Sequence, residues 1–422
     1  MRDETIAIHG GYVPDGTRAV AVPIYQTVAH DFVDARHAGA VFDLETPGFH
    51  YNRINNPTND VLEQRISALE GGVGALAFSS GSAAVTFSIL NIAGSGDHVV
   101  SANSLYGGTY NLFVHTLPRF GLDIDLVDPA DPENFRRAIK ANTKLLYAET
   151  VGNPKLDTLD IEAVATIAHE AGIPLIVDNT MATPYLIRPI DHGADIVVHS
   201  ATKFIGGHGT SIGGVVVDAG AFDWSQNDRF PGLVEPDASY HGFKFFEALG
   251  PLAYIVKLRV SLLRDIGAAL SPFNAFLFLQ GLETLPLRMD RHSDNAHAVA
   301  RLLEDHGKVA WVSYPGLPSH PSFALADKYH YRGLFGAMIG FGVEGGREAG
   351  RRFVESTRLL SHVANIGDAK SLCIHPATTT HSQLTAEEQL LSGVTDDFVR
   401  LSIGIETIDD IIADIEQALA KA

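Results

Sequence analysis

The stretch Asp195-Ile196-Val197-Val198-His199-Ser200-Ala201-Thr202-Lys203-Phe204 is the most informative part of the chain. Its apolar run, 196–198, predicts a buried strand, and the glycine-rich segment 206–209 predicts a loop soon after it. A lysine carried into such a pocket loses part of its hydration, which lowers its pKa and lets the neutral amine attack a carbonyl group. Lys203 is therefore either a reactive amine or an ordinary surface lysine, and the rest of the chain has to decide between the two.

Short apolar runs alternate with helical patterns on both sides of this stretch. Because strands that are covered on both faces read as continuous apolar runs, we expect an α/β fold with a mostly parallel, seven-stranded sheet. Ligands of such sheets bind beyond the carboxyl ends of the strands, which is where Lys203 would lie. The predicted strands are 75–78, 98–101, 124–127, 144–148, 174–177, 195–198 and 215–217.

The pattern divides the chain into three predicted parts. Residues 1–62 contain turn signals, and their apolar segment 20–25 is broken by proline, so we expect an irregular arm that packs on another domain or a neighbouring subunit. Residues 63–272 would form the domain with the large sheet. Residues 273–422 would form a smaller α+β domain, with predicted strands at 309–314, 338–343, 371–374 and 399–405 and a last helix at 408–420.

The composition argues against several classes of protein. A net charge of −19 over 422 residues repels nucleic acid and anionic membranes, so neither is an expected partner. A single cysteine, Cys373, rules out an internal disulfide and argues strongly against a thiolate zinc site, and the histidines lack zinc-type spacing, so we expect no metal. With no signal-like start and no apolar run long enough to cross a bilayer, the expected location is cytoplasmic.

Asp178 ends a second apolar run and is expected to be half-buried. A buried carboxylate needs a cation or donors, unless it simply caps the following turn. If Asp178 and Lys203 lie on neighbouring strand ends, the pair suits pyridoxal phosphate (PLP), whose ring nitrogen the carboxylate would keep protonated.

The phosphate of that cofactor needs an anion site. The turn at Gly81 and Ser82 leads from a strand into a helix, whose N-terminus favours anions, and Ser200 and Thr202 can add hydroxyl donors. Each charge-assisted hydrogen bond contributes about 1.5–3 kcal/mol, so several together are needed. Arg53 from the arm is either a phosphate ligand or a surface residue.

Two further residues, Tyr106 and Arg400, could bind a cofactor or a substrate. Tyr106 lies among loop-forming residues, where its ring is either merely exposed or stacked on a flat cofactor. Arg400 lies inside an apolar strand and needs an anion, which is either a substrate carboxylate or an internal acid.

These motifs together resemble the Cys/Met-metabolism family of PLP-dependent enzymes, over essentially the whole chain and in the family's order. The resemblance implies the aspartate-aminotransferase-like fold (fold type I) and a homotetramer built as a dimer of dimers. The matching segments are 51–53, 56–58, 105–108, 178–180, 200–203 and 375–381.

The resemblance also implies roles for individual residues. Lys203 would be the catalytic lysine that binds the cofactor and moves protons, and Tyr106 would stack on the cofactor ring and take part in catalysis. Asp178 would pair with the ring nitrogen, and Asn153 would lie near the ring hydroxyl. The phosphate would be bound by Gly81, Ser82, Ser200 and Thr202, with Tyr51 and Arg53 reaching across from the neighbouring subunit. The substrate would be bound by Arg400, Asn365, Tyr51 and Asn153.

Within the family the chain is most similar to the O-acetylhomoserine sulfhydrylases, through segments such as 23–27, 108–113, 240–242 and 365–372. That subgroup exchanges the acetate of O-acetyl-L-homoserine for sulfide or methanethiol, in methionine biosynthesis. Methionine γ-lyase and cystathionine γ-synthase activities stay open, although Gly108 stands where the γ-lyases usually carry cysteine. Ser82 stands where several relatives have methionine, but the expected contact there is a backbone amide.

A non-catalytic dinucleotide-binding module is the alternative from another class. It would need a Gly-x-Gly-x-x-Gly turn after the first strand, and the chain has none there. It also predicts a protein that stays colourless with PLP. The choice between acetylated and succinylated substrates, and between sulfide and methanethiol, is not determined by these motifs.

Overall fold

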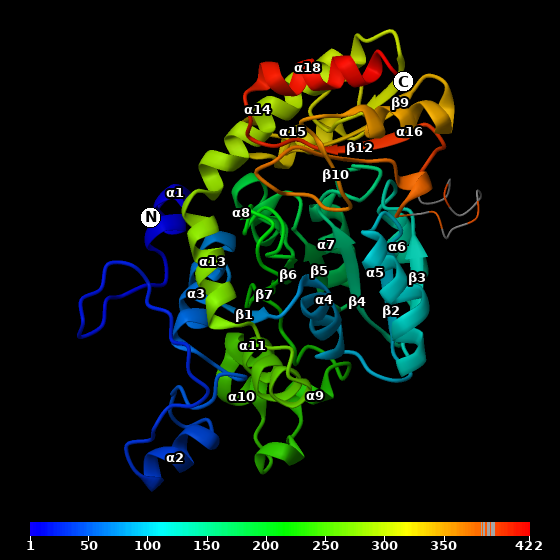
Figure 1. Ribbon diagram of the computed structural model, residues 1–422. Coiled ribbons are helices and arrows are strands. Elements are labelled where there is room, and N and C mark those ends of the chain that lie inside the picture. The colour runs from blue at the N-terminus through cyan, green and yellow to red at the C-terminus, as the bar shows by residue number, and fades with distance from the viewer. Residues whose placement is uncertain (381, 383–384, 386–388, 390–392) are drawn as a thin grey trace.

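The computed structural model describes residues 1–380, 382, 385, 389 and 393–422 (Figure 1). His381, the last residue of the 375–381 motif, lies outside the described residues.

A seven-stranded sheet with the order β1-β7-β6-β5-β4-β2-β3 forms the centre of the larger part. All neighbouring strands are parallel except β7, which runs antiparallel to both β1 and β6. The predicted seven-stranded, mostly parallel sheet is therefore confirmed. Its strands are β1 (Gly74–Phe78), β2 (His98–Ala102), β3 (Asp123–Val127), β4 (Thr143–Glu149), β5 (Leu175–Asp178), β6 (Ile196–His199) and β7 (Gly214–Asp218).

Helices cover both faces of this sheet. Consecutive residues of β2, β6 and β7 are all buried, although their side chains point to opposite faces. This double burial explains why the strands are visible in the sequence as unbroken apolar runs. The helices around the sheet are α3 (Pro57–Glu70), α4 (Gly81–Leu90), α5 (Gly107–Asn111), α6 (Glu133–Ala138), α7 (Ile161–Glu170), α8 (Thr183–Leu186), α9 (Pro231–Val234), α10 (Phe245–Leu249), α11 (Ala253–Leu258) and α12 (Arg264–Ile266).

The second part is built on a five-stranded sheet with the order β10-β11-β12-β9-β8 and has its own apolar core. In Figure 1 it sits at the top, joined to the large sheet by the long helices α13 and α14. The helical stretch expected from Asn274 breaks at Thr284, before Pro286, close to the predicted interruption. Its elements are α13 (Pro272–Glu283), α14 (Leu285–Glu304), β8 (Val309–Ser313), α15 (Phe323–Tyr329), β9 (Met338–Val343), α16 (Gly346–Ser356), β10 (Ser361–His362), β11 (Leu372–Ile374), β12 (Phe398–Ser402) and α18 (Ile408–Leu419).

The N-terminal segment is less irregular than its sequence indicates. It contains α1 (Asp3–His9) and α2 (Ala35–Phe42), and α3 already begins at Pro57. The buried guanidinium of Arg65 on α3 donates to the carbonyls of Gly10 and Ala7, which holds α1 on the body of the protein. Residues beyond α1 run out to α2, away from the rest of the chain (Figure 1). The domain boundaries at 62 and 272 stay predictions.

In the described part of the chain, no helix combines the length and the apolar composition that a membrane crossing requires.

Candidate active site

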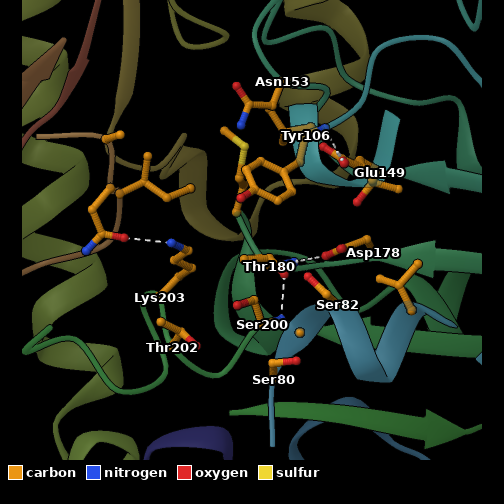
Figure 2. Close-up of a pocket in the computed structure, with 18 of the residues that line it drawn as sticks. Ser80, Ser82, Tyr106, Glu149, Asn153, Asp178, Thr180, Ser200, Thr202 and Lys203 are labelled. Carbon is orange, nitrogen blue, oxygen red and sulfur yellow. Dashed lines mark hydrogen bonds between the residues drawn. The ribbon is translucent and has the colours of Figure 1, made fainter. Parts of the chain in front are cut away.

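A cavity of about 230 Å³ lies at the carboxyl ends of the parallel strands, between the two parts of the chain. It brings together most of the residues predicted for the site, and Figure 2 shows their side chains converging on it. The predicted residues that line it are Gly81, Ser82, Tyr106, Asn153, Asp178, Ser200, Thr202, Lys203, Asn365 and Arg400.

Lys203 enters this cavity from the loop that follows β6. Its Nζ donates a hydrogen bond to Oδ1 of Asn365, 2.6 Å away, on the segment between β10 and β11 (Figure 2). Burial, together with the positive charge of Arg400, lowers the pKa of Lys203 from 10.5 to about 8. A substantial fraction of this amine is therefore neutral near physiological pH, as a nucleophilic or proton-accepting lysine requires.

Arg400 on β12 is buried in the cavity wall and is 9% exposed. Its Nη1 donates to Oδ1 of Asn153 at 3.3 Å, and no carboxylate of the described residues lies within ion-pair distance of it. Desolvation lowers the pKa of Arg400 to about 10, so the guanidinium still carries its charge at neutral pH. The internal salt bridge left open by the sequence is absent from the described part of the chain, and a buried cation of this kind is suited to an anionic ligand.

Asp178 ends β5, on the neighbouring strand to the one that leads to Lys203. Its Oδ1 accepts a hydrogen bond from the N–H of Thr180 at 2.9 Å, and the hydroxyl of Tyr147 approaches Oδ2 at 3.5 Å. Burial raises the pKa of Asp178, so a cationic group bound beside it would stabilise the ionised carboxylate.

The N-terminus of α4 forms an anion cradle beside the end of β6. Ser80 caps the helix by accepting from the N–H of Ala83, and no acceptor is found among the described residues for the amides of Gly81 and Ser82. A side chain at Gly81 would lie 2.6 Å from Cβ of Ser200, so only glycine lets the turn approach the strand end this closely.

The two hydroxyl residues predicted for the phosphate differ in their surroundings. The N–H of Ser200 donates to Oγ1 of Thr180 at 2.8 Å, and its hydroxyl makes no hydrogen bond within the described chain. The hydroxyl of Thr202 donates to the carbonyl of Gly213 at 3.2 Å and accepts from the Gly213 N–H at 3.0 Å. Ser200 is therefore the freer donor of the two.

Tyr51 and Arg53 do not line the cavity of their own chain. Arg53 instead donates to the backbone carbonyl of Arg264, and its guanidinium lies 5.2 Å from the centre of the Tyr51 ring. If the two residues reach a phosphate, they do so in another copy of the chain.

Among the lining residues that the sequence analysis did not assign to the site, Glu149 and Thr180 hold others in place. Glu149 ends β4 opposite Asp178 in the sheet, and its Oε1 accepts the N–H of Tyr106 at 2.7 Å. Thr180 orients both Asp178 and Ser200 through the hydrogen bonds given above. The signal for Glu149 was present, since it follows an apolar strand in the same way as Asp178 does.

The charges of the cavity fit PLP. Among the described residues, no acceptor is bound by the amides at the start of α4 and no ion pair is formed by Asp178, and Lys203 is a desolvated amine at the same set of strand ends. These are the three groups that a phosphate, a pyridine nitrogen and an aldehyde would satisfy. The surroundings of the buried Arg400 leave room for a further anion.

Comparison with known proteins agrees with this chemistry. The profile of the "Cys/Met metabolism PLP-dependent enzyme" family matches residues 4–420. The O-acetyl-L-homoserine sulfhydrylase of Leptospira meyeri is 56% identical, with 99% of this chain and 97% of the relative covered. The homocysteine synthase of Schizosaccharomyces pombe is 54% identical, with coverage of 99% and 98%.

A solved structure shows the same fold. It is the crystal structure of a putative O-acetylhomoserine (thiol)-lyase from Campylobacter jejuni, described with N'-pyridoxyl-lysine-5'-monophosphate, and it is 41% identical to this chain. The two structures superpose with a TM-score of 0.97 over 100% of each chain, which confirms the predicted fold type. From the desolvated lysine to the full-length match, the findings agree that this chain belongs to the Cys/Met metabolism PLP-dependent enzymes.

Proposed function

We propose that the protein is an O-acetyl-L-homoserine sulfhydrylase, which replaces the acetate of O-acetyl-L-homoserine with sulfide, or with methanethiol, to form L-homocysteine or L-methionine. The observation that carries the proposal is the full-length identity of 56% and 54% to relatives named for this chemistry. The lysine and arginine of the cavity support it, because an amino-acid substrate needs a base at its Cα and a cation for its carboxylate.

Arg400 binds the α-carboxylate of the substrate in this proposal. Its charge is buried, so the ion pair forms in a medium that screens it weakly. Asn153 orients the guanidinium through its Oδ1, and the amide of Asn365 lies on the Lys203 side of the same cavity. The substrate Cα would then be directed towards Lys203.

Lys203 moves the protons. With a pKa of about 8, the neutral amine can take the proton from Cα, assist the loss of a proton from Cβ and return both as the product forms. PLP, when bound, supplies the electron sink for these proton removals. Acetate is a good leaving group from Cγ, so no dedicated general acid is required for its departure.

Cofactor binding in this proposal uses Gly81, Ser82, Ser200 and Thr202 for the phosphate and Asp178 for the ring nitrogen. Tyr106 stacks on the ring, with Asn153 near the ring hydroxyl. Tyr51 and Arg53 come from a neighbouring subunit of a homotetramer, which is consistent with their position away from the cavity of their own chain.

The test is a product profile of the purified, PLP-loaded protein with O-acetyl-L-homoserine, with and without sulfide. We expect homocysteine and acetate in equal amounts when sulfide is present, and methionine with methanethiol. Ketobutyrate and ammonia as the main products in the presence of sulfide would show a γ-lyase instead. O-succinyl-L-homoserine and O-acetylserine, run in parallel, identify the preferred substrate.

A further inference from the structure

Gly107 and Gly108 begin α5, directly after Tyr106, but they have different surroundings. A methyl group at Gly108 would lie 2.4 Å from Cε1, 3.0 Å from Cζ and 3.2 Å from Cδ1 of the Tyr106 ring. A methyl group at Gly107 would have no atom within 4 Å beyond its chain neighbours, Tyr106 and Gly108, and the backbone of its own helix. Neither glycine has a positive φ, so the backbone accepts alanine at both positions. A methyl group at Gly108 would therefore overlap the phenol ring, whereas one at Gly107 would meet no side chain beyond those of its chain neighbours.

The backbone at Tyr106 is held in place from the other side. Its N–H donates to Glu149, at 2.7 Å, and Glu149 is 8% exposed at the end of a central strand. No cation of the described residues forms an ion pair with this carboxyl, and burial, with the nearby Asp178, raises its pKa well above 4.5. With the backbone anchored in this way, a side chain at position 108 can be accommodated only by moving the ring.

We propose that Gly108 is a positioning residue for Tyr106: the space left by its missing side chain holds the phenol ring and sets where that ring meets the cofactor. The proposal rests on the stacking role assigned to Tyr106 in the proposed function, but not on the identity of the substrate. The ring is 52% exposed, so it has room to move when it is displaced, and we expect G108A to fold.

The experiment compares G108A with the matched control G107A. The readout is the dissociation constant of PLP, obtained by titrating the cofactor-free protein, together with the absorption maximum of the loaded protein. We expect G108A to bind PLP about 3- to 10-fold more weakly, which is the range for a lost aromatic stacking contact, and to shift the absorption band. G107A should stay within about twofold of the unmodified protein, because its methyl group meets no atom beyond its immediate neighbours in the chain.

The same two substitutions in a Y106A background identify the cause. Without the ring, G108A should have no further effect on PLP affinity, since the atoms it would meet are gone. If G108A alone failed to fold, the Y106A/G108A protein should fold, because the ring is the obstacle. An unchanged affinity and spectrum in G108A, or an equal loss with and without the ring, would overturn the proposal. Because no substrate is used, such a result is separate from a failure of the sulfhydrylase assay.

Discussion

The reactivity of Lys203 depends on its burial in the same cavity as a second cation, Arg400. Desolvation is the larger cause of its low pKa and the charge of Arg400 is the smaller. We expect R400M to raise the pKa of Lys203 only part of the way back towards 10.5, because the charge is removed while the burial stays. The cofactor-free protein should then need a higher pH for half-maximal rate of PLP capture, followed by absorbance. R347Q, which changes an exposed arginine of α16, should leave the midpoint where it is.

Glu149 gives a second prediction, in the stability of the cofactor-free protein. Its pKa is raised well above 4.5 by burial, so the folded state keeps a proton that the unfolded chain releases. The free energy of unfolding therefore falls as the pH rises from about 4.5 towards the raised pKa. E149Q still accepts the Tyr106 N–H and cannot ionise, so its free energy of unfolding should fall less between pH 5 and pH 8. Urea titrations of both proteins at the two pH values test this, and parallel losses would contradict it.

One buried network joins α3 to the ends of β5 and β6, which carry the site. Oε1 of Glu70, at the end of α3, accepts from Nε2 of His199 on β6 at 2.6 Å and from Nδ2 of Asn179, after β5, at 2.8 Å. All three side chains are fully buried. This network fixes the strand ends from which Asp178 and Ser200 enter the cavity.

Removal of Glu70 should consequently destabilise the protein. We expect E70A to lower the free energy of unfolding by about 2–4 kcal/mol, since two buried donors lose their acceptor. Urea unfolding measures this. E133Q is the control, because Glu133 forms an exposed ion pair with Arg136 on α6 and its loss should change stability by less than about 0.5 kcal/mol. A loss in E70A no larger than in E133Q would mean that the network does not hold the strand ends.

At the scale of the whole molecule, Arg53 lies on the N-terminal arm, away from the cavity of its own chain, so we expect active sites that are shared between subunits. We expect a protein that combines K203A chains with R53E chains to recover activity that neither variant has alone. In such a hybrid, one site combines Lys203 of the R53E chain with Arg53 of the K203A chain. That site is complete only if Arg53 acts across the interface. Co-expression with two different affinity tags provides the hybrid, and sulfhydrylase assays compare it with each parent. If a verified hybrid recovered no activity, Arg53 would not act in the neighbouring subunit's site. Analytical ultracentrifugation of the unmodified protein would give the number of subunits.

Much of the architecture is readable from the sequence because of double burial. The central strands of the large sheet are apolar on both faces, so runs such as 175–177 and 196–198 identify β5 and β6 to within a residue or two. The two-residue strand β10 was missed, since both of its residues are exposed and leave no apolar pattern. The helices α1 and α2 were missed because they bury little more than Ala7 and Val41.

The sequence by itself determined the sheet, the order of the motifs and the type of each reactive group, because these depend on local pattern. The tertiary structure decided how those groups act on one another. It placed Asn365 against Lys203, left Arg400 without an acid among the described residues, and put the ring of Tyr106 into the space beside Gly108. The physical reason is that desolvation, charge coupling and steric fit depend on neighbours far apart in the chain, such as Lys203 and Asn365, which only folding brings into contact.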